Sequence, residues 1–188
     1  MESFKMSALK VVQAAAVLLK EHAARMSRLR LLKLLYIADR ESLVETLHSI
    51  SGDHVVAMDH GPVLSRTYNL LKGEDCESPL WDQFIVQEGP QDHRLCADPG
   101  VGKLSRYEIE KLRAVSEKRR SMNDYDIAVE SHGFDEWIKN KPSQGSSRRI
   151  PLDDLLTALH LMPFKEKMLA EVRSDDELDQ LLATTVQK

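Results

Sequence analysis

With 188 residues, of which 42% are hydrophobic and only 5% aromatic, the chain can fill one core, mainly with aliphatic side chains. That composition favours helices packed on helices over a large β-sandwich. The formal net charge of −4 gives no overall attraction to nucleic-acid phosphates, and two cysteines cannot build a disulfide framework. No stretch approaches the roughly 20 apolar residues of a membrane span, so we expect a cytoplasmic protein with reduced thiols and no membrane contact.

Two helices are predicted at the start of the chain. Ser7 can cap the first, over residues 8–24, and Ser27 can cap the second, which should run from Arg28 to about Leu47. The apolar side chains of the second helix lie at positions 29, 31, 32, 34, 35, 38 and 43. A helix that is apolar nearly all round is packed by neighbours on several sides. We therefore expect this helix to be central and to pack against the first as a helical hairpin.

A polar stripe interrupts the apolar surface of the central helix. It consists of Lys33, Tyr36, Asp39 and Arg40, whose spacing of i, i+3, i+6 and i+7 makes them project the same way. One interpretation is a solvent-facing seam, with the Tyr36 ring snorkelling and Asp39 paired to a nearby base. The other is a polar patch presented to a partner or a small molecule. Charge stripes usually face water, which favours the first interpretation.

The next segment predicts an extended run followed by a turn. Residues 54–58 form the extended run, and Gly61 and Pro62 the turn, because glycine permits a backbone that other residues resist and proline fixes φ. Pro62 fits the first turn of a third helix over residues 63–71. The acidic segment 74–82 is predicted to be a loop.

A β-hairpin is predicted downstream of that loop. Residues 83–87 and 94–97 flank the sequence Gly89-Pro90-Gln91-Asp92, which is typical of a four- or five-residue connection. We expect a small sheet here, with residues 54–58 as a candidate third strand.

The second half of the chain is predicted to be helical. Ser105 and Glu108 form a capping box, with a hydroxyl at the cap and a carboxylate three residues later, which opens a helix to about Arg120. The polar segment 142–147 is predicted to be an exposed loop. The other helices are expected at residues 125–131, 151–161 and 164–183, the last of them split by the acidic run 174–177. Neither an internal repeat nor a boundary between two domains is evident.

Candidate metal ligands are few. Asp53, His54, Asp59 and His60 lie close in the sequence, and His54 and His60 would share one face of a strand, but a zinc site needs a third and a fourth ligand. Weaker candidates are Cys76, His93 and Cys96. The chain has no phosphate-binding glycine loop, nucleophile elbow or His-Glu-x-x-His motif. We therefore expect no enzyme, metal or cofactor; the alternative is a metal-dependent or small-molecule enzyme that uses His54 and His60.

Basic residues cluster in two places. Arg113, Lys118, Arg119 and Arg120 lie at the end of the capped helix, and Arg148–Arg149 lies in the later loop. Bases at a helix C-terminus complement the macrodipole, which is a purely structural role. The alternative is a patch for an acidic protein or for nucleic acid, as in a DNA-binding regulator of a phage or mobile element. Neither run contains aromatic residues that could stack on bases, so nucleic acid is not the expected partner.

Three motifs follow one another in the central part of the chain. Lys33–Arg40 reads Lys-Leu-Leu-Tyr-Ile-Ala-Asp-Arg, Ala57–Val63 ends in Gly-Pro-Val, and Tyr68 lies on the helix that follows. Further matching positions are Leu104-Ser105, Ser131-His132 and Trp137. This ordered set, over about residues 8–160, resembles the Panacea domain, the SocA-like antitoxin family. His60 is a departure, since the residue before Gly-Pro is often aromatic in such sequences.

The resemblance implies a compact, mostly helical, non-enzymatic domain. Such a domain neutralises a partner toxin by binding it, or acts as a proteolytic adaptor that hands the toxin to a cellular protease. Several members are encoded in phages or mobile elements, so the implied partner is a toxin encoded nearby.

Together these observations predict a mainly α fold: a compact multi-helix domain around a central leucine-rich helix, with a small antiparallel β-hairpin or sheet. The expected organisation is a SocA-like antitoxin domain over residues 1–162 and a C-terminal helical extension of the same domain over residues 163–188. The motif residues expected either to hold the Gly-Pro turn or to border a partner-binding surface are Lys33, Tyr36, Asp39, Arg40, His60, Gly61, Pro62 and Tyr68.

Overall fold

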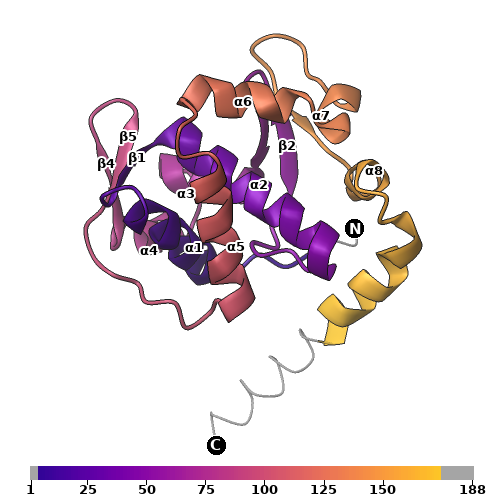
Figure 1. Cartoon of the computed structure of the whole chain (residues 1–188), viewed down its shortest axis with the longest axis horizontal. Coiled ribbons are helices and arrows are strands. Elements are labelled where there is room, and N and C mark those ends of the chain that lie inside the picture. Colours follow the sequence, from indigo (N-terminus) through magenta and orange to yellow (C-terminus); the bar gives the residue numbers. More distant parts are fainter. Residues whose placement is uncertain (1–3, 175–188) are drawn as a thin grey trace, which may run out of the picture.

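The computed structural model describes residues 4–174 of the chain. Its helices are arranged around α2 (Arg28–Thr46), which contacts α1 (Ala8–Lys20), α5 (Arg106–Lys118) and α6 (Asp124–His132). Figure 1 shows α2 crossing the middle of the molecule, with one small sheet beyond one of its ends. The predicted mainly α fold around a leucine-rich helix, with small antiparallel sheets, is confirmed. Within residues 4–174, no helix combines the length and apolarity needed to cross a bilayer.

The central position of α2 follows from its cap and its leucines. The Ser27 hydroxyl accepts a hydrogen bond from the Arg30 backbone N–H at 3.1 Å, so the predicted cap is confirmed. Leu31 and Leu34 are completely buried, and burying each such side chain contributes about 1.5–3 kcal/mol to folding. The helix ends where Leu47 adopts a left-handed backbone with φ of 65°.

The first helix is shorter than the sequence suggested. α1 ends at Lys20, and the expectation that it reaches Ala24 is wrong. Ala23 and Ala24 take positive φ angles of 52° and 62°, which turn the chain into the short strand β1 (Arg25–Ser27). α1 does contact α2 as expected, but a strand, not a simple break, connects the two helices.

The first sheet has the strand order β1-β5-β4 and is antiparallel. β4 (Ile85–Glu88) and β5 (Asp92–Leu95) form the predicted hairpin. The expectation that residues 54–58 join this sheet is wrong, because β1 takes that place, with Met26 opposite His93.

Residues 54–58 contribute instead to a second antiparallel sheet, of order β3-β2-β6. β2 (Val55–Met58) pairs with β3 (Gly61–Leu64) on one side and with β6 (Arg148–Arg149) on the other. The prediction that Gly61 and Pro62 form the turn and open a helix is therefore wrong, and so is the assignment of residues 148–149 to a loop. Pro62 is tolerated because β3 is an edge strand, which need not donate every backbone N–H.

Two elements differ from the sequence expectation around α3 (Ser65–Lys72). α3 begins at Ser65, after strand β3, and not at Val63. The segment predicted to be loop contains the short helix α4 (Ser78–Asp82), with Pro79 near its start. This helix forms because Trp81 is almost completely buried in the core, at 1% exposure.

The remaining helices follow the sequence more closely. The capping box of Ser105 and Glu108 is present at the start of α5, and α6 is followed by α7 (Asp135–Lys139). α8 (Leu152–Ala158) stops short of the predicted Leu161, because the chain turns at His160 with φ of 59°.

The chain then continues through a 3₁₀ turn, η1 (Met162–Phe164), into helical residues 165–174. Met168 and Leu169 on this segment are buried, at 2% and 3% exposure. The predicted break at residues 174–177 lies, apart from Ser174, outside the described residues. The division into residues 1–162 and 163–188 stays a prediction.

Candidate functional site

The polar stripe of α2 is covered by other parts of the chain. Lys33, Tyr36 and Asp39 are 0%, 1% and 4% exposed, and only Arg40 is half-buried. Both interpretations of the stripe placed it at the surface, and for these three side chains that expectation is wrong. Each of them makes a hydrogen bond to a segment that packs on α2. We call these buried side chains and their partners the buried frame, because they join α2 to its neighbours.

Lys33 joins α2 to the β2–β3 hairpin. Its Nζ donates a hydrogen bond to the Pro62 carbonyl oxygen at 2.8 Å. No carboxylate among residues 4–174 forms an ion pair with it. Burial therefore lowers the pKa of the Lys33 ammonium to about 7. A buried, unpaired amine of this kind is costly to keep charged.

Gly61 makes the close approach of the hairpin to α2 and α6 possible. Its φ is +93°, a conformation that side-chain-bearing residues rarely adopt. A Cβ at this position would overlap the Ser131 hydroxyl and lie 2.8 Å from Lys33 Nζ. The Gly-Pro, Lys and Ser-His motifs of the sequence are therefore in mutual contact, although they are far apart along the chain.

His132 and Trp137 hold the other side of this junction. Their rings stack with centroids 4.3 Å apart and an interplanar angle of 12°. The indole Nε1 donates to the Met58 carbonyl at 3.0 Å, at the end of β2. Burial, together with the nearby Lys33 charge, lowers the pKa of His132.

Tyr36 and Arg40 join α2 to α7 through a carboxylate that the sequence analysis missed. The Tyr36 hydroxyl donates to Glu136 Oε1 at 2.6 Å, and Arg40 Nε donates to the same oxygen at 2.8 Å. Arg40 also lies over the Phe134 ring, 4.2 Å from its centroid. Burial, with the Glu136 charge second, raises the pKa of Tyr36. Glu136 is one of many acids in the sequence, and only its burial, at 0% exposure, distinguishes it.

Asp39 binds the loop that follows α2. The expectation that it pairs with a basic side chain is wrong. Its carboxylate accepts hydrogen bonds from the Ser51 backbone N–H and hydroxyl, each at 2.9 Å, and from the Ser49 hydroxyl, also at 2.9 Å. Burial nevertheless raises the pKa of Asp39, because the low-dielectric interior disfavours the charge.

We expect Asp39→Ala to lower the free energy of unfolding by about 2 kcal/mol, because the buried Ser51 N–H then loses its acceptor. Asp39→Asn should cost less than about 1 kcal/mol, since an amide oxygen can still accept from that N–H and serine hydroxyls can rotate. Urea unfolding of the two variants measures both values. Equal losses in the two would mean that the negative charge, and not the acceptor, holds the loop.

Four of the predicted site residues line one cleft, which we call the hairpin cleft. It has a volume of about 490 Å³ and is lined by the first two turns of α2, the β2–β3 hairpin, Tyr68 on α3, Gln91 and residues 145–147. The predicted residues in its wall are Lys33, His60, Gly61 and Tyr68. The other four, Tyr36, Asp39, Arg40 and Pro62, do not line it. Arg28, which sequence reasoning did not select, lies in the same wall.

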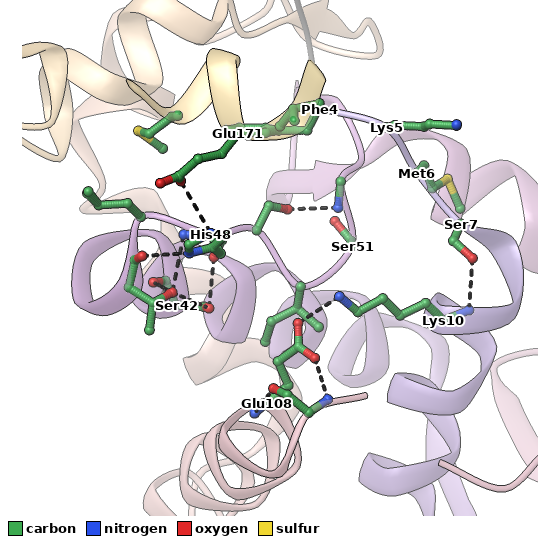
Figure 2. A pocket seen from close by; sticks show the side chains of 18 of the residues that line it. Phe4, Lys5, Met6, Ser7, Lys10, Ser42, His48, Ser51, Glu108 and Glu171 are labelled. Carbon is green, nitrogen blue, oxygen red and sulfur yellow. Dashed lines mark hydrogen bonds and ion pairs between the residues drawn. The ribbon is translucent and has the colours of Figure 1, made fainter. Parts of the chain in front are cut away.

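A larger groove lies elsewhere, between the two ends of the described chain. In Figure 2, Phe4 and Glu171 are drawn next to each other at the top of the groove, Met6 and Ser7 at the right, His48 below Glu171, and Ser51 near the middle. The groove has a volume of about 660 Å³, and His48 Nε2 lies 3.3 Å from Glu171 Oε2 across it. None of the eight predicted site residues lines this groove, so the motif does not coincide with it.

The candidate metal ligands are not brought together. His54 and His60 line different clefts. Asp53 accepts hydrogen bonds from the backbone N–H groups of Arg66 and Thr67, at 3.1 and 2.8 Å, and so serves the start of α3. Within the described part of the chain, no three histidine, cysteine or acidic side chains are grouped as a metal site would require. Both cysteines, Cys76 and Cys96, are free and exposed.

Three of the four bases at the end of α5 pair with acids of the fold, while Lys118 is exposed, so the cluster is not the free patch that was one alternative. Arg113 lies 3.1 Å from Glu21, and Arg120 lies 2.6 Å from Glu117. Arg119 is 3% exposed and pairs with Glu130 at 2.6 Å. Their charges are therefore largely neutralised within the fold.

A scan of protein families finds one model that matches residues 31–138, described as "Antitoxin SocA-like, Panacea domain". The match begins within α2 and includes the β2–β3 hairpin, α6 and most of α7, the elements that the contacts described above join. It is narrower than the predicted range of 8–160, but it covers more than half of the 188 residues. No curated protein and no solved structure matches the chain. The chain belongs to the SocA-like antitoxin family of Panacea domains.

Proposed function

We propose that this protein is an antitoxin-type binding module that neutralises a partner toxin by direct contact. The observation that carries this proposal is the family match over residues 31–138, which includes most of the central helix and several of the segments packed on it. The buried frame supports it in a second way. Lys33, Tyr36 and Asp39 are buried and hydrogen-bonded to neighbouring segments. These polar side chains therefore stabilise the fold, and a partner would bind to other residues at the surface.

The surface that best fits a protein partner lies on α6 and α7. Tyr125 and Val129 are 68% and 45% exposed and, at i and i+4, share one face of α6. Ile138 on α7 is 56% exposed. Large exposed apolar side chains of this kind, with an aromatic anchor, are typical of interaction sites.

The charges around these side chains define the partner's chemistry. Asp126 and Asp135 lie beside them and are exposed. Neither forms an ion pair within residues 4–174, where most acids do. We therefore propose that the toxin docks here with an apolar patch bordered by lysine or arginine. Opposite charges at the rim would speed association more than they strengthen it.

The test uses the toxin gene that we expect beside this one. Co-expression should rescue growth, and the two proteins should co-purify. Val129→Ser and Tyr125→Ala should each weaken binding by about tenfold or more, which is the usual effect of losing an interface anchor. Val44→Ser is the matched control, because Val44 is an α2 valine of similar exposure, 48%.

The outcomes separate the proposals. No rescue and no co-purification with the neighbouring product would contradict the antitoxin role itself. Rescue with equal effects of Val129→Ser and Val44→Ser would reject the α6–α7 face but keep the role. If the toxin disappears from cells only when a host protease is active, delivery to that protease replaces direct neutralisation.

A further inference from the structure

The hairpin cleft contains an arginine that the fold does not neutralise. Arg28 lies at the start of α2 and is half-buried in the cleft wall. Its guanidinium makes neither a hydrogen bond nor an ion pair within residues 4–174. By contrast, nearby Arg25 lies 2.6 Å from Asp92, and Arg30 lies 3.1 Å from Asp124. An arginine that is partly desolvated and unpaired has five donors available for a ligand.

Two other nitrogen-bearing side chains belong to the wall of this cleft. Lys33 forms part of the wall. Its amino group donates one hydrogen bond to the Pro62 carbonyl oxygen and forms no ion pair with a carboxylate of the described chain. His60 is exposed at the tip of the β2–β3 hairpin. Asp59 is the acid in the described wall, and its Oδ2 already accepts a hydrogen bond from the Gly145 N–H at 2.7 Å.

The first turns of α2 contribute a further effect. Arg28, Leu29 and Lys33 come from the start of this 19-residue helix, where the macrodipole is positive. The cleft is also large enough for a small molecule, since its 490 Å³ falls within the common range for ligand pockets, about 300–1,000 Å³. Tyr68 supplies an aromatic wall beside the cations. The volume and the basic side chains of the cleft therefore both indicate a small anionic ligand.

We propose that the hairpin cleft binds a small molecule carrying a phosphate or carboxylate group, with Arg28 as its principal contact and His60 at its rim. This site is separate from the α6–α7 face and does not depend on the antitoxin role. A bound anion would bridge the start of α2 and the β2–β3 hairpin, which come from different parts of the chain. Lys33 lies within reach of both segments and would favour its charged form once the anion is bound.

The full-length protein is titrated by calorimetry with pyrophosphate in one arm and citrate in the other, at constant ionic strength set with potassium chloride. Saturable binding of either anion supports the site. Binding of pyrophosphate indicates a phosphate ligand, and binding of citrate indicates a carboxylate ligand. Arg28→Gln should weaken binding at least tenfold, and His60→Asn by a smaller factor. Lys118→Gln, which removes an exposed unpaired cation on α5, should leave binding unchanged.

Circular dichroism and thermal unfolding of each variant show whether the fold is retained. Since Arg28 and His60 make no described side-chain hydrogen bond, both variants are expected to fold. If neither anion binds more tightly than chloride does, the proposal is wrong. It is equally wrong if Arg28→Gln and Lys118→Gln bind alike, because the anion is then attracted by surface charge in general.

Discussion

Gly61→Ala is expected to lower the free energy of unfolding by about 2–5 kcal/mol. About 1–2 kcal/mol of this comes from forcing a Cβ into the left-handed region, since the φ of Gly61 is +93°. A further 1–3 kcal/mol comes from overpacking, because the Cβ would overlap the buried Ser131 hydroxyl and press on Lys33 Nζ. Denaturant unfolding of the variant, followed by circular dichroism, measures the sum.

The matched control is Gly73→Ala. Gly73 also has a positive φ, 76°, but a Cβ there would meet nothing within 4 Å. This variant should therefore lose only the backbone cost, about 1 kcal/mol. Adding Ser131→Ala to Gly61→Ala should restore about 1 kcal/mol, because it removes the nearest overlapping atom. Equal losses in Gly61→Ala and Gly73→Ala would show that the hairpin does not press on α6 as described.

Local patterns in the sequence were sufficient to predict much of the fold. The Ser27 cap and the Ser105–Glu108 capping box depend only on residues three positions apart, so they can be read from the chain directly. The same holds for the leucines of α2, whose spacing makes burial on several sides necessary. The β4–β5 hairpin was recognisable from its short connection.

The site could not be predicted in the same way, because its partners are distant in sequence. The spacing of Lys33, Tyr36 and Asp39 predicts one side of a helix, but it does not show which segments cover these side chains. Glu136 is 100 residues from Tyr36, and no local pattern connects them. Likewise, β2 pairs with β6, and the paired residues Val56 and Arg149 are more than 90 positions apart in the sequence. Such long-range pairs decide whether a polar stripe faces water or a neighbouring segment.

Replacement of Lys33 should change how stability depends on pH. In the folded protein burial lowers the Lys33 pKa to about 7, whereas the ordinary value is 10.5. Below pH 7 both the folded and the unfolded chain hold the proton, and burying the charge then costs up to about 5 kcal/mol. As the pH rises from 7 towards 10.5, the folded protein releases the proton and the unfolded chain still binds it. Stability must therefore rise with pH in this window.

In Lys33→Met this contribution is absent. Between pH 6 and pH 9 the free energy of unfolding of the unsubstituted protein should rise by about 2–3 kcal/mol more than that of the variant. Loss of the hydrogen bond to the Pro62 carbonyl lowers the variant's stability by the same amount at every pH, so it does not affect the slope. Urea unfolding in chloride buffers, without phosphate or citrate, measures both curves. Lys118→Met, at an exposed position, should run parallel to the unsubstituted protein. If the Lys33→Met curve also runs parallel, the amine is hydrated in solution and is not the buried, unpaired group that joins α2 to the hairpin.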